Sequence, residues 1–133
     1  MRVILKEPAM KDCIFCKIAS GQIKSDVVFK DDKAMVIKDI NPQAPVHMLV
    51  LPLVHIESVA DIHGANEPLM GHLVAVANDV AKKQGLAQRG YRLQVNCGPD
   101  GGQTVFHLHV HLFGGRQLGP LLCKHTQAYQ ASA

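Results

Sequence analysis

Histidine alternates with aliphatic residues near the C-terminal end of this chain, and this pattern constrains the fold more than any other. Residues 107–113 read HLHVHLF. A period of two is typical of a β-strand, because successive side chains of a strand point to opposite faces of the sheet. We therefore predict a strand over Val105–Phe113, with its aliphatic side chains in the core and its imidazoles together on the other face.

The three imidazoles belong to His107, His109 and His111, and they indicate a reactive site because histidine changes its charge near neutral pH. The alternative, an exposed polar face that happens to be rich in histidine, must explain a regular alternation. Two kinds of chemistry remain open. Two imidazoles can bind a catalytic zinc ion that keeps an open position for water. Alternatively, one imidazole attacks a phosphorus atom to form a phospho-histidine while a neighbour manages charge.

The residues just before this strand favour the covalent alternative. Gly101, Gly102, Gln103 and Thr104 form a turn with a flexible backbone. The N–H groups of the turn, the Gln103 amide and the Thr104 hydroxyl can all donate to phosphate oxygens. A glycine turn alone can simply connect two strands, but beside the histidines it indicates a phosphate site.

The rest of the chain predicts an α+β domain with a five-stranded, mostly antiparallel sheet. We expect a short helix over Cys13–Ser20, capped by Asp12, and a long helix between Asn66 and Gln84, where apolar residues recur at three- and four-residue steps. The other predicted strands cover the ranges Val27–Lys30, Ala34–Ile40, His47–Leu51 and Tyr91–Asn96.

Composition argues against several classes of protein. No apolar run approaches the ~20 residues of a membrane helix, and the first ten residues lack a secretory signal, so we expect a cytoplasmic protein. The basic residues are scattered, and two tyrosines, four phenylalanines and no tryptophan do not suit a nucleic-acid groove. Cys13 and Cys16 have the CxxC spacing of metal ligands, although two small, semi-buried thiols would give the same pattern.

At this point the sequence resembles a known family. GQTVFHLHVHLF over residues 102–113 resembles the signature of the histidine triad (HIT) superfamily. Four other motifs resemble the family and follow its order: CIFCKI at 13–18, DINPQAPVH at 39–47, PLVHI at 52–56 and GGRQ at 114–117. The last two of these, together with Asn96 and DGG at 100–102, resemble the Hint branch, the purine nucleoside phosphoramidases.

The resemblance implies a HIT-like fold with one long and one short helix, whose sheet continues across a homodimer. It covers residues 12–117, which we take as the HIT domain. Residues 1–11 are then an N-terminal arm, which we expect to be poorly ordered, and residues 118–133 a C-terminal tail. The tail has no tryptophan, and since the C-terminus of the family helps to set specificity, the resemblance does not define the leaving group.

The resemblance also implies catalytic roles. His109 matches the family nucleophile, which attacks the α-phosphorus and forms a nucleotidyl-histidine. His111 matches the partner that binds the phosphate and helps to manage the proton of the leaving group. His47 matches a histidine behind the site that orients an imidazole tautomer. Thr104 stands where the family usually has serine, and its hydroxyl can still donate to a leaving nitrogen or bridging oxygen.

Nucleotide contacts are implied for a further set of residues. Asn96, Gly102 and Gln103 match phosphate contacts, as do Thr104, His109 and His111. Asp39 matches the residue that accepts both ribose hydroxyls, and Ile40, with Phe15 and Ile18, would form the apolar slot for the base.

Some family members hold zinc with a CxxC pair, the histidine of a Pro-x-x-His motif and the first triad histidine. The matching residues here are Cys13, Cys16, His55 and His107. This closed Cys2His2 set would be structural and would remove His107 from the chemistry. Many relatives lack the cysteines and fold without metal, and the resemblance implies no organic cofactor.

The implied activity is hydrolysis of a purine nucleoside 5′-phosphoramidate or related adenylate to the 5′-monophosphate, with no nucleic-acid or membrane partner. One alternative is a dinucleoside polyphosphate hydrolase, the other familiar outcome of a histidine triad. A second is a nucleotide-binding scaffold that contacts other proteins and keeps only vestigial activity. The sequence does not distinguish adenine from guanine.

Overall fold

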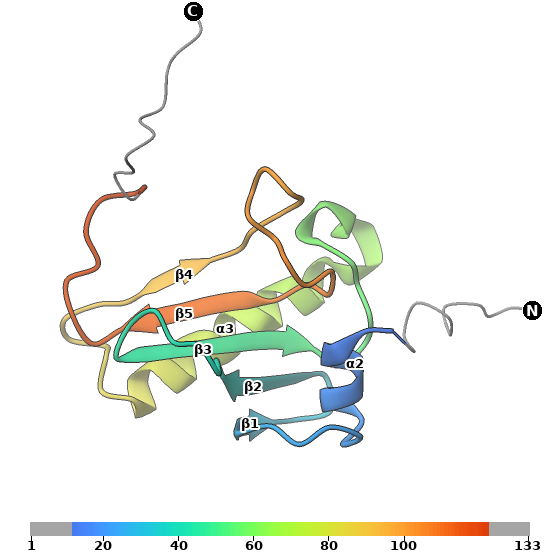
Figure 1. Cartoon of the computed structure of the whole chain (residues 1–133), viewed down its shortest axis with the longest axis horizontal. Helices are drawn as coiled ribbons and strands as arrows, with labels where there is room; N and C mark the ends of the chain where they lie inside the picture. Colours follow the sequence, from blue (N-terminus) through green and yellow to red (C-terminus); the bar gives the residue numbers. More distant parts are fainter. Residues whose placement is uncertain (1–11, 123–133) are drawn as a thin grey trace, which may run out of the picture.

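A computed structural model describes residues 12–122, whose five strands form one antiparallel sheet in the order β1-β2-β3-β5-β4 (Figure 1). This confirms the predicted α+β class, while the predicted arm at 1–11 and the end of the predicted tail, 123–133, lie outside the described residues. Two 3-10 turns, η1 (Val59–Asp61) and η2 (Gly64–Asn66), were not predicted. The strands are β1 (Val27–Lys30), β2 (Ala34–Lys38), β3 (Val46–Pro52), β4 (Arg92–Gln94) and β5 (Val110–Gly114), and the helices are α2 (Ile14–Ala19) and α3 (Glu67–Lys83).

Helix α3 covers one face of the sheet (Figure 1). Its buried residues recur at three- and four-residue steps, as expected for the apolar stripe of a helix that packs on a sheet: Leu73, Val76, Ala77, Val80 and Ala81. They pack on alternate strand residues such as Val36, Val50 and Val110. No helix among residues 12–122 is long and apolar enough to cross a bilayer.

The short helix α2 packs on the opposite face, where Met35, Leu49 and Leu51 are buried with its Phe15. The helix begins one residue later than predicted, and its N-cap is Cys13 rather than Asp12. The Sγ of Cys13 accepts a hydrogen bond from the backbone N–H of Cys16 at 3.3 Å, which satisfies one of the unpaired donors of the first turn.

The histidine strand is shorter than predicted, because β5 begins only at Val110. Its partner β3 pairs Val50 with Val110 and ends at Pro52, which has no N–H to continue the ladder. The N–H of Leu108 donates instead to the carbonyl of Ile56 at 2.7 Å. His107 and His109 therefore lie in the segment that leads into β5, and only His111 lies within the strand.

The predicted alternation nevertheless holds across this boundary. Leu108, Val110 and Leu112 are all buried in the core under α3. The histidines between them lie on the side of α2, because the ring of Phe15 meets the rings of both His107 and His109 edge-on. The sheet thus separates a packing face from a histidine face.

Candidate functional site

The histidine face brings together residues from three parts of the sheet. His111 lies on β5, His47 lies on the neighbouring β3, and Asp39 directly follows β2. The ring centroids of His109 and His111 are 5.0 Å apart, and those of His47 and His111 are 5.2 Å apart. The three histidines that the sequence predicts for catalysis, His47, His109 and His111, therefore lie together, and Asp39, predicted for the ribose contact, lies beside His47.

A single hydrogen bond fixes the tautomer of His109. Its Nδ1 lies 2.7 Å from the carbonyl oxygen of His107, and because a carbonyl can only accept, Nδ1 carries the proton. The other ring nitrogen, Nε2, is left with its lone pair. Burial lowers the pKa of His109 below its usual range, more than the His107 carbonyl and the charge of Asp39 raise it. His109 is therefore neutral near pH 7, with an unprotonated lone pair on Nε2.

A relay of hydrogen bonds fixes the tautomer of His111 in the same way. The backbone N–H of Gln43 donates to Nδ1 of His47 at 3.1 Å, so the proton of neutral His47 is on Nε2. That Nε2 lies 3.0 Å from Nδ1 of His111 and donates to it. His111 then carries its own proton on Nε2, the ring nitrogen remote from His47, where it can serve as a donor.

Burial keeps both histidines of this relay neutral. Burial, and then nearby charge on His109 and His47, lower the pKa of His111 to about 4, against the opposing effect of Asp39. Burial also lowers the pKa of His47, against the opposing effect of Asp39. The donor at Nε2 of His111 is therefore retained throughout the neutral pH range.

Asp39 adds the only carboxylate that the described residues place beside these rings. Its Oδ2 lies 3.4 Å from Nε2 of His47, and its Oδ1 accepts from the N–H of Asn41 at 2.8 Å. This turn also explains why β2 ends at Lys38, two residues earlier than predicted. The carboxylate keeps further lone pairs, which a pair of ribose hydroxyls can use.

Gln103 differs from its predicted use as a phosphate donor. Its side chain is buried, and Oε1 accepts from the N–H of Gly98 at 2.9 Å. Nε2 donates to the carbonyls of Glu57 at 2.9 Å and Val105 at 3.1 Å, so both amide hydrogens are used. The backbone N–H of Gln103 donates to the carbonyl of Gly98 as well. This residue holds the glycine turn in place instead of offering a free donor.

Other members of the turn keep free donors. The exposed hydroxyl of Thr104 forms no hydrogen bond with any residue of the described range. Asn96 uses Oδ1 to accept from Gln94 at 3.2 Å, and its Nδ2 lies near Gly102, at 3.7 Å from where a Cβ on that glycine would stand. Gly102 itself has a φ of +85°, which favours glycine, but its N–H donates to the carbonyl of Pro99.

The predicted base slot is only partly formed. Ile40 presents an apolar side chain that is 97% exposed, next to Asp39 in the sequence. Phe15, by contrast, is buried behind the ring of His109, at a centroid distance of 5.1 Å, and Ile18 packs in the same α2 cluster. Phe15 therefore packs against the ring of His109, which leaves Ile40 as the accessible apolar side chain.

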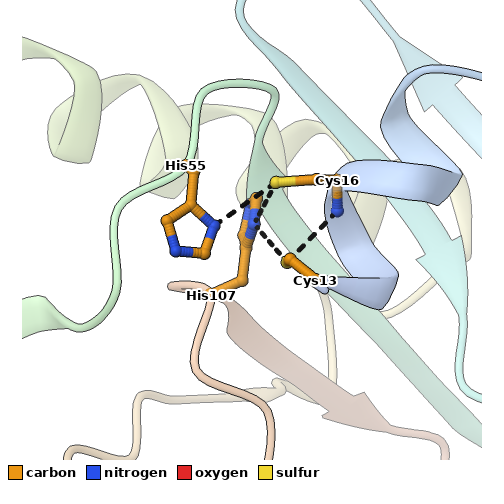
Figure 2. Close-up of side chains that lie close together, drawn as sticks. All are labelled: Cys13, Cys16, His55 and His107. Carbon is orange, nitrogen blue, oxygen red and sulfur yellow. Dashed lines mark hydrogen bonds between the residues drawn. The ribbon is translucent and has the colours of Figure 1, made fainter. Parts of the chain in front are cut away.

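A second cluster joins the four residues predicted to bind zinc: Cys13, Cys16, His55 and His107 (Figure 2). They come from α2, from the loop after β3 and from the segment before β5. Their four ligand atoms all lie within 4.8 Å of one another. Sγ of Cys13 is 3.3 Å from Nδ1 of His107, and Sγ of Cys16 is 3.3 Å from Nδ1 of His55.

This geometry fits a tetrahedral metal ion. Bonds of about 2.3 Å to sulfur and about 2.0–2.1 Å to nitrogen place such ligand atoms roughly 3.5 Å apart. Nε2 of His107 donates to the carbonyl of Pro52 at 2.9 Å, so its Nδ1 lone pair faces the cysteines. Burial, and then a hydrogen bond with Cys13, raise the pKa of the Cys16 thiol to about 12, so a cation is needed to make it a thiolate.

The same geometry does not support a catalytic zinc ion on neighbouring histidines. His107 turns its Nδ1 toward the cysteines, and the described residues contain no metal-ligand group that includes His109. Asp39, His47 and His111 do come within 4.8 Å, but the histidine nitrogens that meet there already share a hydrogen bond. The two clusters therefore divide the three histidines between a metal-binding arrangement and a hydrogen-bonded one.

Sequence reasoning missed the backbone groups that set these tautomers. The groups are the N–H of Gln43 and the carbonyl of Pro52. Nearly every residue has such backbone groups, so the residue type does not indicate which of them will contact a histidine. Arg116 was quoted only as part of the GGRQ motif, without a role. It donates through Nη2 to the carbonyl of Gln43 at 3.2 Å and thereby supports the loop that contacts His47.

Comparisons with known proteins place the chain in a family. Residues 12–124 match the family model described as scavenger mRNA decapping enzyme C-term binding. The purine nucleoside phosphoramidase of Escherichia coli (strain K12) is 44% identical over 112 residues, which are 84% of this chain and 94% of that protein. A HIT family hydrolase from Clostridium thermocellum has 45% identity and a TM-score of 0.82, over 85% of this chain and 98% of that one. A histidine triad protein from Clostridium difficile has 45% identity and a TM-score of 0.81, over 84% and 96%.

Proposed function

Because this chain belongs to the histidine triad superfamily, whose similar members include nucleotide hydrolases, we propose that it hydrolyses purine nucleoside 5′-phosphoramidates to the nucleoside monophosphate. The observation that carries the proposal is the tautomer of His109. Its Nδ1 proton is held by the His107 carbonyl, which leaves a neutral Nε2 lone pair on a face that also presents a donor from His111.

The proposed reaction has two displacements at phosphorus. Nε2 of His109 attacks the α-phosphorus, the phosphorus–nitrogen bond breaks, and the leaving nitrogen takes a proton from the Thr104 hydroxyl, which is reprotonated from solvent as the amine departs. The imidazolium formed in this way keeps its Nδ1–H bond to the His107 carbonyl, which stabilises the charge. Water then attacks the phosphorus and gives a proton to solvent, the bond to Nε2 breaks, and the monophosphate is released with His109 neutral again.

His111 and Thr104 serve the charges that develop during these steps. Nε2–H of His111 donates to a phosphate oxygen, and the His47 relay holds that proton in place. The free hydroxyl of Thr104 donates to the leaving nitrogen. Neutral imidazoles suit this work, since each keeps one donor and one acceptor.

The nucleotide itself is held by groups around the rings. Asp39 accepts from the ribose hydroxyls, Nδ2 of Asn96 donates to the phosphate, and Ile40 contacts the base. Gln103 acts indirectly, because its buried amide fixes the turn from which Thr104 and Asn96 are presented.

We further propose that Cys13, Cys16, His55 and His107 hold a structural zinc ion. The ion would supply a closed crosslink between α2, the loop after β3 and the segment that carries His109, and no reaction step depends on it. The resemblance also supports a cytoplasmic homodimer, in which β4, an edge strand of the sheet, and the neighbouring face of α3 meet their counterparts.

The test compares substrates and a nucleophile variant. Purified protein is given adenosine 5′-phosphoramidate and, separately, a diadenosine polyphosphate, and the release of adenosine 5′-monophosphate is measured. We expect the phosphoramidate to have the higher kcat/KM, and we expect His109→Ala to abolish turnover while it still binds the monophosphate. Preference for the diadenosine compound would show that the chain is a dinucleoside polyphosphate hydrolase. Very slow turnover of every substrate would support the alternative of a nucleotide-binding scaffold that contacts other proteins. A fully active His109→Ala would contradict the mechanism.

A further inference from the structure

The hydrogen bond that fixes the tautomer of His111 has a competitor. Nε2 of His47 donates to Nδ1 of His111 at 3.0 Å, and Oδ2 of Asp39 lies 3.4 Å from the same Nε2 atom. Neutral His47 has a single proton on this nitrogen, so the ring of His111 and the carboxylate of Asp39 are alternative acceptors for it. His111, at the shorter distance, is the acceptor in this structure.

The backbone keeps the carboxylate of Asp39 within reach of His47. Strands β2 and β3 are paired as far as Lys38 and Met48, and the N–H of Asp39 then donates to the carbonyl of His47 at 3.0 Å. Oδ1 of Asp39 is held by the N–H of Asn41 at 2.8 Å, which leaves Oδ2 to approach the ring. The side chain of His47 is 3% exposed and that of Asp39 is 19% exposed, so a ligand can contact the carboxylate but not the ring.

The two acceptors have opposite effects on His111. When His111 accepts at Nδ1, its own proton is on Nε2, where it can be donated to a phosphate oxygen. When Asp39 accepts instead, the hydrogen bond that enforces this tautomer is lost. An ionised carboxylate is a stronger acceptor than a neutral ring, because charge-assisted hydrogen bonds are roughly twice as strong as neutral ones. The charge of Asp39 also acts on both rings, since it opposes the effect of burial on the pKa of His47 and of His111.

A bound nucleotide can remove this competition. Ribose hydroxyls that donate to Asp39 use the lone pairs of its carboxylate and weaken it as an acceptor for the proton of His47. We propose that Asp39 is a positioning residue that couples recognition of the ribose to the tautomer of His111, so that substrates with free 2′ and 3′ hydroxyls select the competent state of the site. This inference rests on the proposed nucleotide hydrolysis, and it adds an effect on the reaction rate to the ribose contact.

The first test measures the tautomer by NMR and needs no turnover. The ¹⁵N shifts of the His111 ring are recorded on the full chain at pH 7.5, free and saturated with adenosine 5′-monophosphate or with its 2′,3′-dideoxy analogue. Asp39→Asn removes the competing acceptor at constant shape, because its Oδ1 can still accept from Asn41 while its NH2 group cannot accept from His47. We expect the monophosphate to raise the Nε2–H tautomer of wild-type His111 more than the dideoxy analogue does. Free Asp39→Asn should already show more of this tautomer than the free wild type.

The second test measures the rate of a single turnover at saturating protein, with adenosine 5′-phosphoramidate and its 2′,3′-dideoxy analogue. In the wild type, loss of the hydroxyls should lower this rate about tenfold, in addition to any weaker binding, because the charged acceptor then competes for the proton of His47. In Asp39→Asn the two substrates should react at the same rate. Asp26→Asn is the matched control, because it removes a carboxylate that is 70% exposed and pairs with Lys38, and it should behave as the wild type in both tests.

Two results would overturn the proposal. One is a wild-type rate that does not depend on the hydroxyls, with only the binding of the dideoxy substrate weakened. The other is the same His111 tautomer in free wild type and free Asp39→Asn. Either result would leave Asp39 as a ribose contact alone. A complete lack of turnover would instead refute the proposed hydrolysis, and the comparison of the free proteins by NMR would still decide whether Asp39 competes for the proton.

Discussion

Replacing Gln103 by glutamate tests whether this residue holds the turn or binds the substrate directly. Glutamate has the same shape, and its carboxylate can still accept from the N–H of Gly98. It cannot donate, so it loses both hydrogen bonds from Nε2, to Glu57 and to Val105. Two carbonyl oxygens then face a buried negative charge.

The magnitude follows from these contacts. Two lost hydrogen bonds contribute about 0.5–1.5 kcal/mol each, and the unpaired buried carbonyls raise the cost further. We therefore expect Gln103→Glu to lower the free energy of unfolding by about 2–4 kcal/mol at pH 7.5. Burial disfavours the introduced carboxylate, so its pKa should rise above the unfolded value. The variant should then be relatively more stable at pH 5, where protonation restores one donor, and lose this stability as the pH rises through the folded pKa.

Urea unfolding at pH 7.5 and at pH 5 measures both effects. Gln88→Glu is the control, because Gln88 is exposed. The substitution introduces the same charge without disturbing a described hydrogen bond. If Gln103→Glu unfolds at the same urea concentration as the wild type but has a strongly raised KM, the side chain binds phosphate directly and the turn-holding role is wrong.

Three further predictions concern the rings, the cysteines and the turn. First, because burial is the main cause that lowers the pKa of His111, to about 4, and also lowers the pKa of His109 and of His47, kcat/KM should stay level from pH 8 to pH 6 and fall only at lower pH, as protonation removes the lone pair of His109 and the acceptor for His47; a fall centred on the usual ~6.5 in protein that is still folded by circular dichroism would refute this. Second, the purified chain should hold about one zinc ion by elemental analysis and Cys13→Ser should lose it, whereas exposed Cys97→Ser should keep it; equal zinc in both variants would exclude the cluster. Third, Gly101→Ala should disrupt the turn and lower both stability and turnover, because the added Cβ would lie 2.4 Å from the carbonyl oxygen of Cys97, while Gly71→Ala in α3, which meets nothing within 4 Å, should be stabilising by roughly 1 kcal/mol; equal melting temperatures for the two variants would show that the turn adapts.

The sequence predicted the sheet because period-two patterns and turn residues are local signals. Val27–Lys30 matches β1 at both ends, and the long helix differs from α3 by one residue at each end. The last strand was predicted too long because its end depends on a partner. Leu108 lies in a strand-like sequence, but its N–H donates to the carbonyl of Ile56 instead of to a strand. The start of β5 depends on where β3 ends, at Pro52, and this can be used only when the register between the two strands is known.

The candidate site was predicted as a set of residues but not as a set of hydrogen bonds. Side-chain chemistry suggested a phosphate donor at Gln103, since an amide can donate. Whether it is free to donate depends on carbonyls from Glu57 and Val105, one of which is distant in sequence. The same reasoning explains the missed role of Gln43, whose contribution comes from its backbone N–H and not from its side chain.

The alternating histidines also connect the two clusters through one residue. The ring of His107 is fixed on both edges, by the carbonyl of Pro52 at Nε2 and by Cys13 at Nδ1. A fixed ring orients the backbone of the same residue, and the carbonyl of His107 is the acceptor that holds the proton on Nδ1 of His109. His107 therefore needs no part in the chemistry to matter for it, because its backbone determines which nitrogen of the next histidine has a free lone pair. The strict alternation places these two rings two residues apart, which is the spacing at which a carbonyl can reach the ring that follows it.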